Sequence, residues 1–436
     1  MVKVSIIVPV YSVSEYLRRC LDSCIYQTLN EIEIIVVNDC SPDKNDTEIM
    51  NEYESNYPQK IRCIWHDENK GSGGARNTAI KAANGDYILC VDSDDYIDLQ
   101  MCEKMYEVAS ESDADMVVCD FYEMKYGIAE YKNYTAIDTE HISEWFPALW
   151  IRLVKKRIII ENGLFLPENC FAQDVFSILW HFASKVIKKV SIPFVYYIDR
   201  PGSAIHTETI KYFNDILISI KSIACSRYYS KMKKEKKQLC SYIAMKFLIN
   251  KLNNLINETP DVFSDAMKKT SEIIKLYNID LTNRIFYKSE NSQEIAAALK
   301  FFLTIYNDES TNKSYLLYLL NQSSLGKKIQ DLYNSFNGRS ITLWGAGVRG
   351  KKYAMIMNQL GFKFEVTDKN ESLFGQEIVP NITVVPWYKL IDQTDIVLVT
   401  VRGGFEEVKK NIHANTPSIK VIDIEDYIKA GVSAND

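Results

Sequence analysis

The sequence lacks several features that would place it in a special class of protein. Its formal net charge is −6 at pH 7, so it has no basic excess of the kind that nucleic-acid binding requires. No run of about 20 apolar residues is present, so no membrane span is predicted. The ten cysteines include no CxxC pair and no spacing typical of zinc ligands. We therefore expect reduced thiols, a cytoplasmic location and no nucleic-acid partner.

Glycine is absent from Ser203 to Leu325, and Pro260 is the only proline of that stretch. Because these two residues interrupt helices, the stretch is predicted to be mostly helical. At 436 residues the chain is too long for one core, and we expect domains at 1–207, 208–335 and 336–436. The basic segment from Lys231 to Lys237 is either a solvated helix face or a peripheral contact with anionic lipids at the inner face of the cell membrane.

The N-terminal part is predicted to be an α/β domain. Apolar runs alternate with amphipathic segments, an order typical of the start of a parallel sheet. Ser14 is expected to cap the first helix, and Asn84-Gly85 to end a helix over Ala75 to Ala83 in a left-handed cap. The predicted strands are Val4 to Val10, Glu33 to Asn38, Ile61 to Trp65 and Met116 to Asp120.

A further apolar run, from Tyr87 to Val91, ends in Asp92, Ser93, Asp94 and Asp95. In extended backbone, residues i and i+2 point to the same face, so the carboxylates of Asp92 and Asp94 can converge on one hard cation. Open α/β sheets bind their ligands at the carboxyl ends of the strands. Taken alone, however, a short acidic run is also typical of a solvated strand end.

Four segments in order resemble the family 2 glycosyltransferases with a GT-A fold, in particular bacterial enzymes that build surface polysaccharides. They are SIIVPVYSVSEYLRRCLDS, VVNDCSPD, NKGSGGARNTAIKAANGDYI and VDSDD, the last of which resembles the DxD motif. The resemblance implies an inverting transfer of a hexosyl or N-acetylhexosaminyl group from a nucleotide sugar, with a UDP-sugar expected. It implies Mn²⁺ or Mg²⁺ as cofactor, and a glycan or lipid-linked saccharide as acceptor. A monomer and a homo-oligomer are both compatible with the sequence.

The resemblance also assigns residues to the donor. It implies that Tyr11 lies near the base and that Asp39 accepts the N–H of the base ring. Asp92, Ser93 and Asp94 should border the sugar, with Asp92 and Asp94 holding the cation; Asp95 receives no role. The residues expected to line the nucleotide are Pro9, Tyr11, Glu15, Asp39 and Arg76.

An acceptor hydroxyl needs a base, and Asp174 is the candidate. It stands among aromatic and aliphatic neighbours, where desolvation would raise the pKa of its carboxyl toward a useful value. The family has Glu-Asp here, and Asp174 matches the Asp that acts as base, whereas Gln173 departs from the Glu. The alternative is an ordinary Asp at the start of a helix.

A later loop, YYIDRPGSAIHT, resembles the family's Arg-x-Gly-Ser loop that closes over the donor. By that resemblance Arg200 would neutralise a phosphate and Ser203 would hydrogen-bond it. His206 is either a metal ligand or a structural residue. Cys40 stands where the family usually has Gly, and nothing beside it in the sequence would activate it as a nucleophile.

The C-terminal part carries the sequence GAGVRG between a predicted strand and a predicted helix. Gly345, Gly347, Gly350 and the downstream Asp368 fit the dinucleotide fingerprint, in which a diphosphate meets the helix N-terminus and the acid meets a ribose. We expect a small Rossmann-like domain that either binds a nucleotide or nucleotide sugar or serves only for packing. Two rival functions follow from it: an NAD(P)-type oxidoreductase and a nucleotide-binding scaffold.

Overall fold

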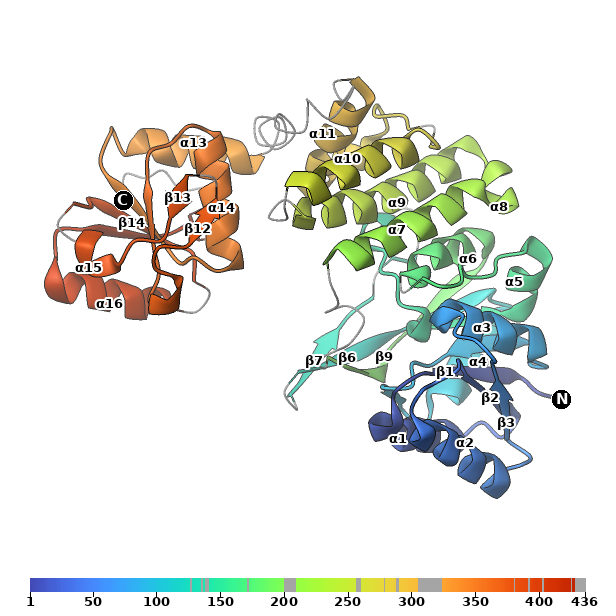
Figure 1. Ribbon diagram of the computed structural model, residues 1–436. Helices are drawn as coiled ribbons and strands as arrows, with labels where there is room; N and C mark the ends of the chain where they lie inside the picture. The colour runs from blue at the N-terminus through green and yellow to red at the C-terminus, as the bar shows by residue number, and fades with distance from the viewer. Residues whose placement is uncertain are drawn as a thin grey trace. The chain divides into compact units, whose positions relative to one another are not determined.

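The computed structural model (Figure 1) divides into two compact units. Residues 1–255 and 272–285 form the first unit, and residues 256–271 and 286–436 form the second. The structure describes residues 1–125, 128–134, 136–137, 141–170, 172–199, 209–255, 260–277, 279–287, 290–304, 324–379, 381–390, 393–401, 404–424 and 426–427.

The first unit is built on one mixed sheet of nine strands. Its order is β3-β2-β1-β4-β8-β6-β9-β5, and β7 pairs with β6. The first four strands are parallel: β1 (Val4–Val10), β2 (Ile32–Asn38), β3 (Ile61–Trp65) and β4 (Tyr87–Cys90). The mixed half contains β5 (Tyr96–Ile97), β6 (Met116–Lys125), β7 (Ile128–Lys132), β8 (Arg152–Lys155) and β9 (Ile187–Ile198). The predicted parallel start of the sheet is confirmed.

Helices cover this sheet, and its central strands are therefore buried. All residues of β1 and β4 are buried, as expected of continuous apolar runs. Helix α3 (Gly71–Ala82) packs on β1 and β2, and α1 (Ser14–Ile25) packs on α2 (Lys44–Asn56). Helix α4 (Met101–Glu111) lies against β6 and β9.

Two local predictions were wrong. Ser14 is the first residue of α1 rather than its cap, and its hydroxyl donates to Asp43; the buried Asp46 carboxylate instead accepts the N–H of Val13, which holds the cap position. Helix α3 ends at an extended Ala83, and Gly85 has no left-handed conformation. A Cβ at Gly85 would lie 2.6 Å from the Ser5 hydroxyl, so close packing explains this glycine.

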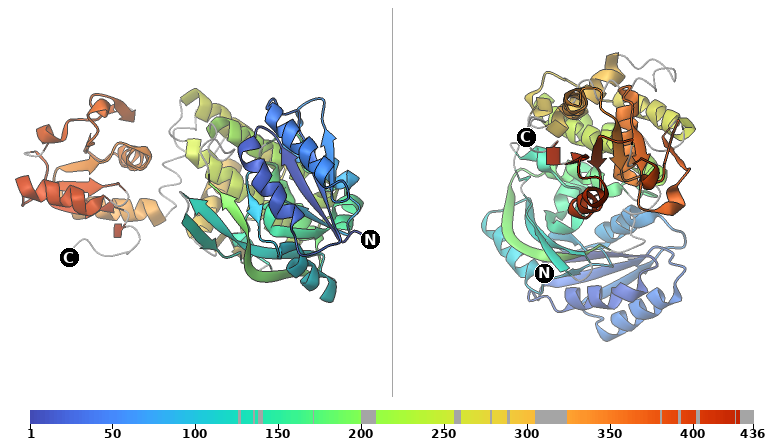
Figure 2. Two further views of the ribbon diagram at one scale, coloured as in Figure 1. Left: turned by 90° about the horizontal axis from the view of Figure 1, so that it is seen from below. Right: turned by 90° about the vertical axis from the view of Figure 1, so that its left-hand side faces the viewer.

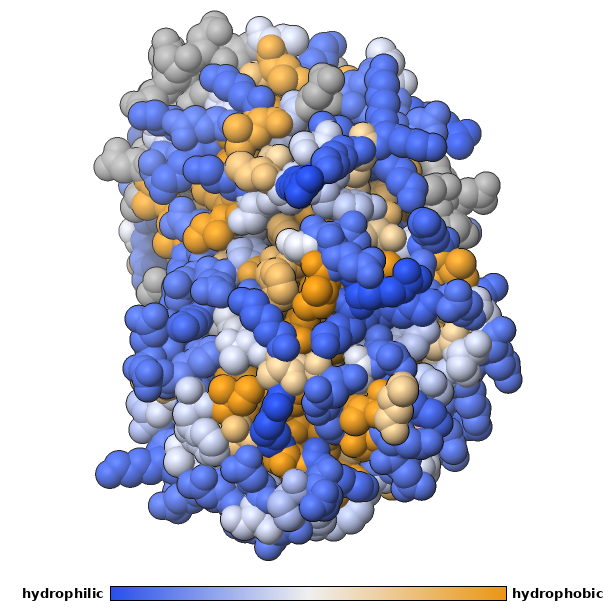
Figure 3. All heavy atoms as spheres, turned by 90° about the vertical axis from the view of Figure 1, so that its right-hand side faces the viewer, coloured by the Kyte–Doolittle hydropathy of each residue, from blue (hydrophilic) through white to orange (hydrophobic). Residues whose placement is uncertain are grey.

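The middle of the chain is mostly helical, as predicted, in the residues described there. Helices α7 (Thr209–Cys225) and α9 (Lys234–Asn254) pack side by side, with α8 (Arg227–Ser230) between them in sequence. Helices α10 (Pro260–Ile274) and α11 (Glu290–Thr304) follow. Within the described ranges, no helix is both long and apolar enough to cross a membrane. On the face drawn in Figure 3, hydrophobic residues lie in separate patches among hydrophilic ones.

The second unit contains a small parallel sheet in the order β11-β10-β14-β15. Its strands are β10 (Ile341–Trp344), β11 (Glu365–Thr367), β14 (Ile396–Val399) and β15 (Lys420–Asp423). Helices α13 (Ser324–Ser335), α14 (Val348–Gln359) and α16 (Phe405–Asn415) pack around it (Figure 2). A short hairpin, β12 (Glu377–Val379) with β13 (Ile382–Thr383), completes the unit.

Candidate active site

The acidic segment follows β4 at the carboxyl edge of the parallel strands. Its backbone turns at Ser93 and Asp94, and the Asp95 N–H donates to the Asp92 carbonyl at 3.0 Å. The prediction that this segment has extended backbone is therefore wrong, because the backbone turns between Asp92 and Asp95. Asp92 and Asp94 are nevertheless half-buried, whereas Ser93 and Asp95 are buried. The two predicted cation ligands thus remain the accessible carboxylates of the segment.

Asp95, which the sequence left without a role, anchors the segment to β9. Its side chain is fully buried and its Oδ1 accepts the Ile198 N–H at 2.7 Å. Burial, together with the charges of Asp94 and Asp92, raises the pKa of its carboxyl well above the usual value. Asp95 therefore fixes the turn that presents Asp92 and Asp94.

Arg76 joins two parts of the site that are remote in sequence. It projects from α3, its side chain is 3% exposed, and its guanidinium donates to both Asp92 and Asp174. The contact with Asp174 is 3.4 Å and links residues 98 positions apart. Burial lowers the pKa of Arg76, but the two carboxylates outweigh it and raise the pKa above the usual value. One buried cation therefore brings the predicted donor end and the predicted base together.

Asp174 lies on a short 3-10 helix, Gln173–Ser177. Burial raises the pKa of its carboxyl to about 6; Arg76 opposes this rise, Asp92 adds to it, and a hydrogen bond from Gln173 opposes it. That bond runs from Gln173 Nε2 to Asp174 Oδ1 at 2.9 Å. Gln173 thus contacts the candidate base directly and stabilises its ionised form.

Asp39 follows β2, where its backbone N–H donates to the Val10 carbonyl. The Asp39 side chain is buried, and its Oδ1 accepts the Lys70 N–H at 2.9 Å. The same oxygen lies 2.7 Å from His66 Nδ1, and His66 Nε2 lies 2.8 Å from the Thr78 hydroxyl. This network holds the carboxylate that the resemblance places against the base ring.

The sequence reasoning missed His66. The available signal was its place directly after β3, at the same sheet edge as Asp39 and Asp92. A lone histidine beside a tryptophan has no distinctive local pattern, so only the fold reveals its contact with Asp39.

The remaining predicted donor residues are placed as follows. Pro9 is buried in β1, Tyr11 is exposed just beyond that strand, and Glu15 is exposed in the first turn of α1. Cys40 is exposed and has a φ of 57°, the left-handed conformation that glycine favours. The turn thus keeps the conformation that suits the family's usual Gly although Cys40 occupies it. Arg200, Ser203 and His206 lie outside the described residues.

The donor atoms present suit a hard divalent cation. Among the residues described, no three His, Cys, Asp or Glu side chains form a group that could hold a metal ion. Two carboxylates are nevertheless typical of Mg²⁺ sites, in which phosphate oxygens of the substrate and waters complete the shell. Asp92 and Asp94 therefore fit a cation that binds together with a diphosphate.

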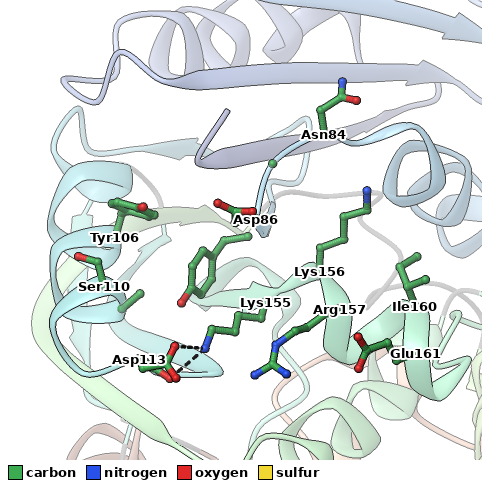
Figure 4. A pocket seen from close by; sticks show the side chains of 13 residues that line it. Asn84, Asp86, Tyr106, Ser110, Asp113, Lys155, Lys156, Arg157, Ile160 and Glu161 are labelled. Carbon is green, nitrogen blue, oxygen red and sulfur yellow. Dashed lines mark hydrogen bonds and ion pairs between the residues drawn. The ribbon is translucent and has the colours of Figure 1, made fainter. Parts of the chain in front are cut away.

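A pocket of about 670 Å³ lies at the opposite end of β4 (Figure 4). It is lined by residues just before β4 and by three consecutive cations, Lys155, Lys156 and Arg157. Lys155 pairs with Asp113 at 2.6 Å, and Arg157 pairs with Asp115 at 3.1 Å. Acids of the same region thus balance Lys155 and Arg157, the Lys156 ammonium donates to the Ala83 carbonyl, and the pocket shares no lining residue with the predicted site.

Known proteins that are similar in sequence to this chain are glycosyltransferases. Residues 5–176 match the model of the family "Glycosyl transferase family 2". The chain is 31% identical over 269 residues to the putative glycosyltransferase EpsH of Bacillus subtilis, covering 57% of this chain and 76% of EpsH. It is 47% identical over 119 residues to the uncharacterized glycosyltransferase EpsJ of the same organism, and this match spans 27% of the chain but only 34% of EpsJ.

A solved structure shares the fold. The structure of S. aureus TarS 1–349 in complex with UDP-GlcNAc aligns with a TM-score of 0.56 at 19% identity, covering 73% of this chain and 92% of that one. At this identity the likeness concerns the fold alone.

Proposed function

We infer the reaction of this chain from the premise that it belongs to glycosyl transferase family 2. It is accordingly a glycosyltransferase that depends on a nucleotide sugar. We propose an inverting, metal-dependent transfer from a UDP-sugar to a hydroxyl of a glycan or lipid-linked saccharide, in the synthesis of a surface polysaccharide at the inner face of the cell membrane. The bridge from Asp92 through Arg76 to Asp174 is the observation that carries this proposal.

The donor lies at the carboxyl ends of β1, β2 and β4 in this proposal. Asp39, held by His66 and the Lys70 N–H, accepts the N–H of the base ring. That arrangement suits uracil, and the neighbour TarS was solved with UDP-GlcNAc. Pro9, Tyr11 and Glu15 line the nucleotide, and Arg200 and Ser203 contact its phosphates.

Asp92 and Asp94 would hold Mn²⁺ or Mg²⁺, which would neutralise the charge that builds on the departing diphosphate. Asp174 removes the proton from the acceptor hydroxyl. The oxygen then bonds to the anomeric carbon from the face opposite the diphosphate, while the bond from that carbon to the phosphate oxygen breaks. A single displacement inverts the anomeric configuration. Arg76 keeps the base near the diphosphate end and limits the cost of burying both carboxylates.

The test is transfer by the Asp174→Asn variant, with donor binding measured in parallel. The loss of a general base typically costs about 10²- to 10⁴-fold in rate, whereas a neutral isostere should leave UDP affinity nearly unchanged. An NMR assignment of the product's anomeric centre tests inversion. An Asp174→Asn enzyme with full transfer activity would remove Asp174 from the base role, and a retained configuration would refute the single displacement.

A further inference from the structure

The second unit contains a cavity of about 370 Å³ whose lining includes none of the residues proposed for the transfer reaction. It opens at the carboxyl ends of β10, β11 and β14, and the family model ends at residue 176, well before it. In this sheet β11 lies on one side of β10, and β14, which comes later in the sequence, lies on the other side. The strand order therefore reverses between β10 and β14, which makes this a topological switch point. Open parallel sheets bind ligands at such points.

The glycines of GAGVRG shape one wall of this cavity. Gly345 has a φ of 116°, and a Cβ there would lie 2.5 Å from the Thr400 hydroxyl. A Cβ at Gly350 would lie 1.6 Å from the Gly345 carbonyl oxygen, so helix α14 can approach the strand end this closely only with glycine. At Gly347, by contrast, the space that a Cβ would occupy is open. The backbone is therefore packed tightly behind the loop and accessible in front of it.

Helix α14 begins at this loop with Gly347 in the cap position and no side-chain cap hydrogen bond among the described residues. Unpaired N–H groups at a helix start, together with the helix dipole, favour a phosphate. Arg349 and Lys369 also line the cavity and bring positive charge, and Glu407 lies in the lining as well. Trp344, Val401 and Val408 give it apolar surface that suits a base.

Asp368 supplies the other end of a nucleotide site. Its Oδ2 accepts the Ala346 N–H at 2.6 Å, and its Oδ1 accepts the Asn370 N–H at 2.9 Å. A carboxylate has about four acceptor positions, so each oxygen keeps capacity for one hydroxyl of a ribose. Because its negative charge repels phosphate, the phosphates belong at Gly347 and the ribose at Asp368.

We propose that this cavity binds a nucleoside diphosphate, with its phosphates at the start of helix α14 beside Gly347 and its ribose on Asp368. The described sheet has only four strands, which corresponds to one mononucleotide-binding half rather than a full dinucleotide fold. The volume is near the lower end of the roughly 300–1,000 Å³ typical of ligand pockets, which also favours a mononucleotide. The cavity shares no lining residue with the proposed transferase site, and its proposed ligand does not depend on the assignment of that site.

The deciding variant is Gly347→Asp in the full chain. The φ of Gly347 is −70°, so an aspartate fits without backbone strain, and aspartate is a preferred helix cap. The variant should therefore fold as well as the wild type while placing a carboxylate where the phosphate would lie. Gln393→Asp adds the same charge at an exposed position outside the cavity lining and serves as the matched control.

Calorimetric titrations with ADP, GDP and UDP give the readout. We expect wild type to bind at least one of the three in this cavity, the Gly347→Asp variant to lose that binding at least tenfold, and Gln393→Asp to keep it. UDP, which also has the transferase site, should change from two binding events to one. Nucleotide binding that is identical in wild type and Gly347→Asp would overturn the proposal, as would binding that disappears only in an Asp39→Asn variant.

Discussion

Acid should inactivate transfer by protonating Asp174. Burial raises the pKa of this carboxyl from 3.8 to about 6. A rise of roughly two units corresponds to about 3 kcal/mol at about 1.36 kcal/mol per unit. Because the side chain is 23% exposed, water offsets part of that cost, and the figure is an upper bound. If Asp174 is the base, kcat/KM should fall about tenfold for each pH unit below about 6.

The hydrogen bond from Gln173 allows this pH dependence to be shifted. Gln173→Leu removes a donor that stabilises the ionised carboxylate, so the pKa of Asp174 should rise further. Hydrogen bonds to charged groups contribute about 1.5 kcal/mol or more, which corresponds to a shift of about one pH unit. The control is Gln376→Leu, which also loses an amide hydrogen bond but lies in the second unit. The measurement is kcat/KM of a UDP-sugar against pH, and superimposable profiles for Gln173→Leu and the control would refute the reasoning.

Stability gives a second readout of the same pKa. A carboxyl whose folded pKa exceeds its unfolded value holds its proton more tightly when folded, so its contribution to stability falls as pH rises from about 3.8 to about 6. Asp174→Asn should therefore raise the Tm at pH 7.5, and the gain should shrink below pH 6. A Tm difference that does not vary with pH would mean that the carboxyl titrates at its ordinary value.

Three further predictions concern other parts of the chain. His66→Phe should weaken UDP binding about tenfold, because it removes the hydrogen bond that holds Asp39. Thr78→Val removes only the hydrogen bond on the far side of the His66 ring and should weaken binding less. Equal UDP titration curves for wild type and His66→Phe would exclude a positioning role for His66. Treatment with EDTA should abolish transfer and Mn²⁺ should restore it, and an unchanged rate would end the metal assignment. Gly73→Ala should lower the free energy of unfolding by about 1–3 kcal/mol in urea titrations, because the new Cβ would lie 2.2 Å from the Pro167 carbonyl oxygen. An unchanged urea midpoint would show that the backbone at Pro167 can move away from the Cβ at no cost in stability.

The sequence predicted most of the parallel strands because their signal is local. β1 and β3 have the predicted bounds, since each is a short, largely apolar segment next to a turn. The errors at Ser14 and Gly85 are due to tertiary contacts. The Ser14 hydroxyl donates a hydrogen bond to Asp43, and Ser5 packs against Gly85. Helix-capping rules use only neighbouring residues, so they cannot predict a contact with a residue of another strand or loop.

The site follows the same division. The acidic segment could be predicted from consecutive residues, and Asp174 from a resemblance. The contact of Arg76 with both carboxylates could not, because it joins α3, the end of β4 and a short helix 98 residues after Arg76. The order β4-β8-β6 was equally out of reach, because β8 inserts antiparallel between two strands that precede it in sequence.

The shared guanidinium of Arg76 has a consequence for how substitutions combine. Residues that contact a common charged partner are energetically coupled, so their effects do not add. Neutralising Asp92 leaves Asp174 as the remaining carboxylate that pairs with Arg76 among the described residues, so a substitution at the proposed donor end also alters the proposed base. A double-mutant cycle on Asp92 and Asp174 should therefore yield a nonzero interaction energy. If Asp92 serves the donor and Asp174 the acceptor, as proposed, a change at one end of the site is felt at the other through the shared guanidinium of Arg76.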